Sequence, residues 1–286
     1  MASDNRFAVL IDADNVSVKY IKIILDEISK DGIATYKRIY GDWTNPSLIS
    51  WKSTLLDNSI IPVQQYSYTT GKNSTDSAMI IDAMDILYSG RVEGFCLVSS
   101  DSDFTRLAAR LRESGMTVIG MGECKTPNSF IAACNKFKYL DILSAADEAE
   151  AEEAAPKAEP AKKPAAQPKK TAQKAAAKKP KEEPKAEKEP KPAEPKKQQE
   201  KAIEEPRTSL RTIRRALRTI VRENSDEDNW IMVSQVGNLL DKRYTDFDVR
   251  NFGFSKLTPF LESLDMFEIK DMKKDSSSPQ KYVRLK

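Results

Sequence analysis

The sequence contains no histidine, and this absence excludes several classes of active site. Without an imidazole the chain can form neither a Ser-His-Asp nor a Cys-His hydrolase centre, and it cannot form a zinc site with histidine ligands. Ribonuclease chemistry that relies on histidine as acid and base is excluded for the same reason. Any hydrolysis by this chain must use carboxylates, a hard metal ion, or both.

Cysteine and long apolar runs are scarce as well. Cys96, Cys124 and Cys134 are odd in number and far apart, and their spacing matches no metal motif, so we interpret them as small core residues in a reducing compartment. No apolar run approaches the roughly 20 residues needed to span a bilayer, and residues 1–6 lack the features of a secretory signal. We therefore expect a cytoplasmic protein without a membrane partner.

Composition changes abruptly along the chain, which indicates three segments. Residues 147–206 consist almost entirely of Ala, Glu, Lys, Pro and Gln and hold 10 of the 15 prolines, which is typical of a disordered, extended linker. We predict a first domain over residues 1–145, a disordered linker over 146–206 and a second domain over 207–286. The second domain has 16 basic and 12 acidic residues, which favours an anionic partner.

The first domain alternates apolar, strand-like stretches with segments of helical spacing. Several of these stretches are continuously apolar, which is typical of strands buried on both faces of a sheet. Repeated β-α units of this length predict an α/β fold with a mainly parallel sheet and helices on both faces. The predicted strands are residues 7–12, 34–39, 60–66, 95–98, 116–121 and 137–142, and the predicted helices are residues 16–29, 46–56, 77–88, 103–113 and 127–133.

The second domain begins with a basic amphipathic helix. Apolar residues recur at helical spacing through residues 210–221, beside a row of arginines. Three helices and a β-ribbon predict a small winged-helix-like domain. The later helical segments and alternating strands are residues 230–240, 247–257, 266–270 and 282–285.

Two apolar strands of the first domain end in the same motif, Asp-x-Asp. Asp12 and Asp14 follow the first strand, and Asp101 and Asp103 follow the fourth. Asp76 lies at the entrance of the helix that precedes the fourth strand. We expect these side chains to converge if the two strands are neighbours, because parallel strands point their carboxyl ends at one edge of the sheet. Crowded carboxylates need a cation, and the oxygen ligands suit Mg²⁺ or Mn²⁺.

Each aspartate also has an ordinary structural interpretation. Asp12 suits a turn, and Asp76 and Asp103 suit the caps of the helices that follow them. Capping explains one aspartate at a time and not the recurrence of Asp-x-Asp after two strands, so we favour the metal site. Asp82 lies six residues beyond Asp76 on another side of the helix, and Asp82 and Asp85 are weaker candidates.

These acidic motifs resemble the NYN (LabA-like) domain of PIN-type nucleases, over about residues 5–143. The resemblance rests on Ile11–Asn15, on Lys72 followed by Asp76 and Asp82, and on Val98–Phe104 followed by Leu107 and Gly115. It implies RNA phosphodiester cleavage that depends on Mg²⁺ or Mn²⁺, and we expect a metal-activated water to attack the phosphorus. The implied catalytic residues are Asp12, Asp76, Asp101, Asp103 and Asn15, the four aspartates being the metal ligands.

One position departs from the family pattern. Ser100 stands where a glycine usually precedes the aspartate. The extra side chain lies next to the predicted metal position, so we expect it to affect the catalytic rate more than the fold.

Residues 208–286 similarly resemble the LOTUS (OST-HTH) domain, through Trp230, Val233–Gly237, Phe247–Arg250 and Gly253–Leu257. The resemblance implies RNA binding, including structured G-rich RNA, and a protein partner for this domain stays open. The arginines could line a merely solvated helix face, although five of them without an intervening acid favour phosphate contact. The predicted RNA-binding residues are Lys72, Arg211, Arg214, Arg215, Arg218 and Lys256.

Three functions are consistent with the sequence. The sequence does not indicate an oligomeric state. We favour a metal-dependent endoribonuclease whose second domain captures RNA. The alternatives are a non-catalytic RNA-binding scaffold with a vestigial acidic pocket and an aspartyl-phosphate phosphohydrolase. Asp12 and Asp14 have the spacing of a nucleophile and its acid/base partner. The phosphohydrolase pattern, however, has an aspartate followed four residues later by a second aspartate, and four residues after Asp101 this chain has Thr105.

Overall fold

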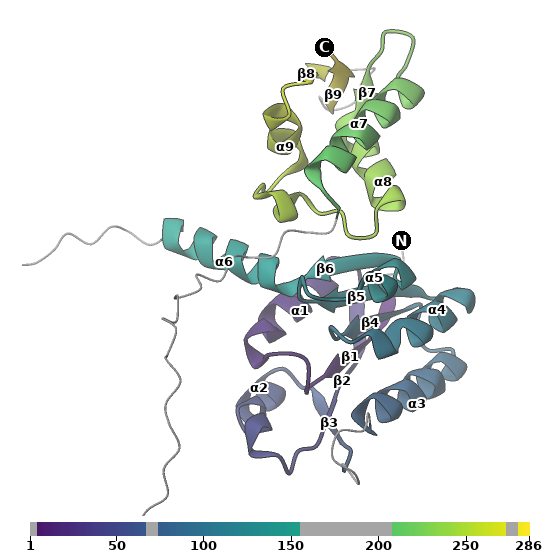
Figure 1. The fold of residues 1–286 in the computed structure, drawn as a ribbon, viewed down its shortest axis with the longest axis vertical. Helices are drawn as coiled ribbons and strands as arrows, with labels where there is room; N and C mark the ends of the chain where they lie inside the picture. Colours follow the sequence, from purple (N-terminus) through teal and green to yellow (C-terminus); the bar gives the residue numbers. More distant parts are fainter. Residues whose placement is uncertain (1–4, 67–73, 155–207, 273–279) are drawn as a thin grey trace, which may run out of the picture.

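The computed structural model describes residues 5–66, 74–154, 208–272 and 280–286. These residues form a larger N-terminal domain and a smaller C-terminal domain (Figure 1). Helix α6 (Leu140–Ala154) leads out of the N-terminal domain, beyond the boundary predicted at residue 145. Lys72 and residues 155–206 of the predicted linker lie outside the described residues, so the linker stays a prediction.

The N-terminal domain is built on a six-stranded sheet in the order β3-β2-β1-β4-β5-β6. Each neighbouring pair is parallel, which confirms the sheet predicted from the β-α repeats. The chain runs outward in one direction from β1 and in the other from β4, so the point where the strand order reverses lies between these two neighbours. The strands are β1 (Arg6–Asp12), β2 (Ile33–Gly41), β3 (Ile61–Gln64), β4 (Gly94–Val98), β5 (Thr117–Gly122) and β6 (Lys136–Tyr139).

Helices cover both faces of this sheet (Figure 1), as predicted. α1, α2 and the start of α6 pack on one face, and α3, α4 and α5 pack on the other. No helix among the described residues is both long and apolar enough to cross a bilayer. The remaining helices of this domain are η1 (Val18–Tyr20), α1 (Ile21–Ser29), η2 (Pro46–Leu48), α2 (Trp51–Asp57), α3 (Ser74–Ser89), η3 (Ser102–Phe104), α4 (Thr105–Glu113) and α5 (Asn128–Ala133).

The continuous apolar run of β1 is explained by its central position. Phe7, Val9 and Ile11 point into the cluster beneath α1 and α2. Ala8 and Leu10 point into the cluster beneath α3 and α4. Both sets are buried. A strand that is covered on each face must be apolar at successive positions, which explains the continuous run.

The strand predicted over residues 137–142 is wrong at its C-terminal end. β6 stops at Tyr139, and Leu140 is the first residue of α6. Leu140 and Leu143, three residues apart, pack into the same core cluster, which fits helical spacing. The Ala- and Glu-rich residues that follow are good helix formers, so the helix continues.

The C-terminal domain packs three α-helices against a three-stranded antiparallel sheet in the order β7-β9-β8. Its core contains Leu217, Val236 and Phe260, all 0 % exposed. This arrangement confirms the small domain of helices and a β-ribbon. Its elements are α7 (Leu210–Asn224), β7 (Ile231–Met232), α8 (Val233–Arg243), η4 (Val249–Phe252), α9 (Leu257–Ser263), β8 (Phe267–Met272) and β9 (Gln280–Leu285).

The three cysteines are buried in the N-terminal domain and are not paired with one another, in agreement with their interpretation as core residues. Burial raises the pKa of the Cys134 thiol to about 12 and also raises that of Cys96. Both thiols are therefore neutral at physiological pH.

Replacing Phe95 by alanine tests the core on the α3 side of the sheet. Phe95 is 0 % exposed, so Phe95→Ala should lower the free energy of unfolding by about 3–5 kcal/mol through lost burial and the cavity left behind. Urea unfolding measures the change. Ile81→Ala is the control, because Ile81 is 63 % exposed and its truncation should change stability by less than about 0.5 kcal/mol. Equal losses in the two variants would contradict this core.

Candidate metal centre

The two Asp-x-Asp motifs form the same turn at the ends of two neighbouring strands. Asp12 Oδ1 accepts a hydrogen bond from the Asp14 backbone N–H (3.0 Å), and Asp101 Oδ1 accepts one from the Asp103 N–H (2.9 Å). Asp101 is the N-cap residue of η3, so Asp103 does not occupy the helix-cap position that the sequence suggested for it. Because β1 pairs with β4, the two turns lie side by side at the C-terminal edge of the sheet.

Three of the four predicted metal ligands come together at this edge. Asp76, Asp101 and Asp103 each offer a carboxylate oxygen, and these oxygens lie within 4.8 Å of one another. Asp76 is the third residue of α3 and so does not occupy the cap position considered for it. Its carboxylate lies in the first helical turn, where the helix dipole favours negative charge.

Asp12 lies outside this group of three. Its side chain is 0 % exposed and accepts hydrogen bonds from Asp14 N–H, Asn15 Nδ2 (2.7 Å) and Ser99 Oγ (2.8 Å). Burial raises the pKa of Asp12, although the bonds from Asn15 and Ser99 oppose that shift. A carboxylate has about four acceptor positions, so Asp12 keeps little capacity for another ligand. Asn15 is exposed at the rim.

Ser99 is a site residue that the sequence did not reveal. Its buried hydroxyl donates to Asp12 Oδ2 and accepts a hydrogen bond from the Asp101 N–H (3.1 Å). One side chain thus joins the two acidic turns. The available signal was a hydroxyl at the end of an apolar strand, two residues before the second Asp-x-Asp motif. The bond from Thr75 Oγ1 to Asp14 Oδ2 (3.0 Å) joins the first turn to α3, the helix that carries Asp76.

Ser100, the departure from the family pattern, is engaged by the connection after β5. Its hydroxyl oxygen accepts a hydrogen bond from the Glu123 backbone N–H (2.9 Å). The fit there is close, since a Cβ on Gly122 would come within 3.0 Å of Ser100 Oγ and 2.6 Å of the Ser99 carbonyl oxygen. The hydroxyl therefore has a structural partner outside the aspartate group, and its effect on a catalytic rate stays a prediction.

The electrostatics of the cluster favour a cation. Asp76 is only 9 % exposed, and its pKa is raised to about 6, first by burial and then by the negative charges of Asp12, Asp101, Asp103 and Asp14. Like charges at this density repel unless protonated or neutralised. Converging carboxylate oxygens are the donors that hard divalent cations prefer, so the residues fit such an ion.

The two weaker candidates are not part of the cluster. Asp82 forms an ion pair with Arg38 and accepts a hydrogen bond from the buried Tyr40 hydroxyl, so it has a structural role. Asp85 is exposed on α3. The predicted RNA-binding residues of α7 and Lys256 are exposed on the other domain.

Repulsion within the cluster predicts a pH-dependent stability without metal. The pKa of Asp76 is raised above the ordinary 3.8, so the folded protein holds the proton more tightly and stability falls as pH rises from about 4 to about 6. The total cost is about 2–3 kcal/mol. Asp76→Asn should remove this fall and make the protein in EDTA more stable than wild type at neutral pH, as measured by urea unfolding.

Asp85→Asn is the matched control, because it removes an exposed carboxylate from the same helix. It should leave the pH dependence unchanged. Added Mg²⁺ or Mn²⁺ should raise the melting temperature of wild type and Asp85→Asn but not of Asp76→Asn. A wild-type pH slope in Asp76→Asn would show that the cluster is not under repulsion.

Two family models agree with this architecture. The chain matches the family model of the NYN domain over residues 6–141 and that of the OST-HTH/LOTUS domain over residues 207–278. No protein of curated function matches it. It is similar to a solved protein of unknown function from Vibrio parahaemolyticus, with 18% identity, 48% of this chain and 93% of that chain covered, and a TM-score of 0.41. The chain therefore contains an NYN domain, of the PIN-like nuclease superfamily, followed by a C-terminal OST-HTH/LOTUS domain.

Proposed function

We propose that this protein is a metal-dependent endoribonuclease that captures RNA through its OST-HTH domain. The observation that carries the proposal is the convergence of Asp76, Asp101 and Asp103 within 4.8 Å at the C-terminal edge of an NYN-domain sheet. That edge, beside the point where the strand order reverses, is where open α/β sheets bind their ligands.

Asp76, Asp101 and Asp103 would hold one or more Mg²⁺ or Mn²⁺ ions. A bound ion of this kind neutralises charge on the phosphodiester and lowers the pKa of a coordinated water. The chain's own contribution is to fix the ligands before substrate arrives. Asp101 is fixed twice, by its bond to the Asp103 N–H and by the bond from its own N–H to Ser99. Asn15, exposed beside Asp12, would contact the substrate.

The geometry of Asp12 does not favour the phosphohydrolase alternative. A nucleophilic carboxylate must be open to the substrate, whereas Asp12 is fully buried and three hydrogen bonds occupy its two oxygens. We assign Asp12 to positioning the turns and to adding negative charge next to Asp76.

RNA capture is assigned to an arginine face on α7. Arg211, Arg214 and Arg215, with two further arginines, are exposed on one side of the helix, and its apolar side packs into the domain core. None of the five forms an ion pair with another residue that the structure describes, so their charge is available for phosphate. Lys256, exposed at the start of α9, is a further candidate. The arginine face consists of Arg211, Arg214, Arg215, Arg218 and Arg222.

Removing one ligand tests the nuclease. Asp101→Asn should lower the rate of RNA cleavage by at least about 100-fold, because a neutral amide binds the cation poorly, and it should leave RNA affinity unchanged. Cleavage of labelled RNA with Mg²⁺ or Mn²⁺ and with EDTA gives the rate, and a filter-binding assay gives the affinity. Asp85→Asn should cleave like wild type.

Two outcomes would contradict the nuclease. Wild type that binds RNA but never cleaves it with either metal would leave a scaffold with a vestigial pocket. Full activity in Asp101→Asn would place the metal site elsewhere.

The arginine face is tested by neutralising four of its members. Replacing Arg211, Arg214, Arg215 and Arg218 by Gln should weaken RNA binding and reduce the salt dependence, lowering the slope of log affinity against log salt by about 3 for single-stranded RNA. Four Gln substitutions at Lys22, Lys52, Arg91 and Arg110, exposed on the NYN domain, are the control and should change both quantities less. Unchanged affinity in the α7 variant would leave the OST-HTH domain as a protein-binding module.

A further inference from the structure

The OST-HTH domain contacts the NYN domain along the edge strand β6 and near the end of α1. Asp31 lies two residues before β2, and Lys136 is the first residue of β6. Of the clustered aspartates, Asp101 and Asp103 follow β4, and Asp76 lies in the first turn of α3. Figure 1 shows the C-terminal domain beside β6 and α6, on the other side of the sheet from β3.

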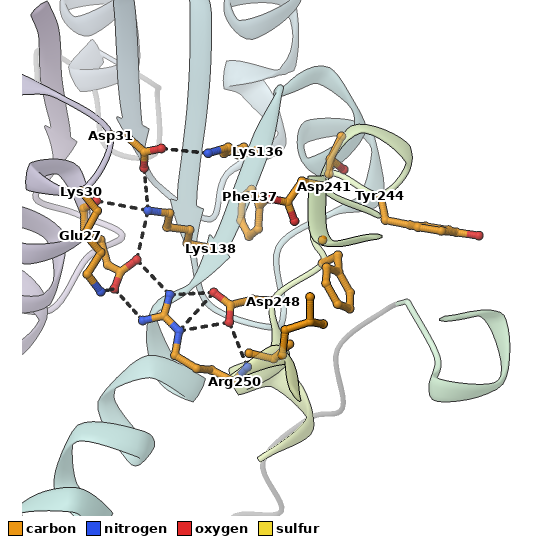
Figure 2. Close-up of a pocket in the computed structure, with 15 residues that line it drawn as sticks. Glu27, Lys30, Asp31, Lys136, Phe137, Lys138, Asp241, Tyr244, Asp248 and Arg250 are labelled. Atoms are coloured by element: carbon orange, nitrogen blue, oxygen red, sulfur yellow. Dashed lines mark hydrogen bonds and ion pairs between the residues drawn. The ribbon is translucent and has the colours of Figure 1, made fainter. Parts of the chain in front are cut away.

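A network of charged side chains crosses this contact (Figure 2). Arg250 of η4 donates to both carboxylate oxygens of Glu27 on α1, from Nη1 to Oε1 (2.6 Å) and from Nη2 to Oε2 (2.9 Å). Lys138 Nζ lies 3.0 Å from Glu27 Oε2 and 2.8 Å from Asp31 Oδ2. Burial alone would raise the pKa of Glu27, but the bonds from Arg250, Lys30 and Lys138 lower it well below the ordinary value. The carboxylate is therefore charged and paired across the two domains.

Neutral contacts accompany the ion pairs. β6 is an edge strand of the sheet, and its Phe137 N–H donates to the Thr245 carbonyl oxygen of the other domain (2.7 Å). The Tyr139 hydroxyl donates to Asp246 Oδ2 (3.1 Å), and Asp246 is only 5 % exposed. α6 also contacts η4. The contact thus satisfies a backbone group and a buried carboxylate as well as Glu27.

We propose that this surface of the NYN domain is a reversible docking site for the OST-HTH domain of the same chain. The docking surface consists of Glu27, Asp31 and residues 136–139. We assign it to the OST-HTH domain of the same chain, because Arg250, Thr245 and Asp246 of that domain contact this surface within one chain.

Reversibility follows from how the charges are paired within each domain. Glu27 retains Lys30 (2.5 Å) and Lys138 when Arg250 leaves, and Arg250 retains Asp248 (2.6 Å). Separation therefore leaves no charge buried without a partner, which is the situation that makes an ion pair costly to break. A cavity of about 440 Å³ also lies between the domains, whereas permanent interfaces are packed like protein interiors.

Docking keeps the two proposed RNA sites apart. The arginine face of α7 does not line the docking cavity, and neither does the aspartate cluster. β5 lies between the docking strand β6 and β4, the strand that Asp101 and Asp103 follow. Docking itself does not depend on catalysis, so its test is independent of nuclease activity.

Small-angle X-ray scattering of the full chain tests the proposal. Wild type should be compact at low salt and should expand at about 1 M salt, where the Debye length falls to about 3 Å. Arg250→Glu should be expanded already at low salt, because it places a carboxylate against Glu27. Arg222→Glu makes the same charge change on the α7 face and should stay compact. Circular dichroism checks that each variant is folded, and the wild-type salt titration needs no variant at all.

Three results would overturn docking within one chain. They are a wild type that is expanded at low salt, an Arg250→Glu variant as compact as wild type, and a compact form whose mass doubles with protein concentration. The last result would assign the surface to the OST-HTH domain of a second copy.

Discussion

The buried carboxylate of Asp12 is the constraint on which the candidate site depends. A charged group with no exposure to water is tolerated only if hydrogen bonds replace its hydration. The donors come from its own turn, from Asn15 and from Ser99 on the neighbouring strand. Ser99 in turn holds the N–H of Asp101, so the β1 and β4 turns cannot move independently. The position of Asp101 therefore depends on a buried residue outside the group of three.

Most of the fold could be predicted from local sequence patterns. Because β1 is buried on two faces, its sequence is continuously apolar, and this signal does not depend on any distant contact. Strand ends were harder to place. β6 stops at Tyr139 because Leu140 and Leu143 enter the core as part of a helix, and an apolar run of this length fits either element. The recurrence of Asp-x-Asp was sufficient to predict that acidic residues meet at one edge.

Contacts between distant side chains left no trace in the sequence. Ser99 and Asp12 are 87 positions apart, and Arg250 and Glu27 are 223 positions apart. Neither pair belongs to a periodic pattern, because hydrogen bonds of this kind depend on how elements are placed in three dimensions. The raised pKa of Asp76 has the same origin, since it needs burial and four neighbouring carboxylates that come from two other parts of the chain.

The covered edge of β6 has a consequence for the NYN domain on its own. An edge strand offers unpaired backbone groups to other chains, and proteins commonly guard such edges with lysines. Here Lys136 and Lys138 are drawn to Asp31 and Glu27, and Thr245 takes the Phe137 N–H. An N-terminal half without its partner domain would present β6 uncovered, with both lysine charges already neutralised. In the docked form the OST-HTH domain would therefore also shield β6 from pairing with the edge of another sheet.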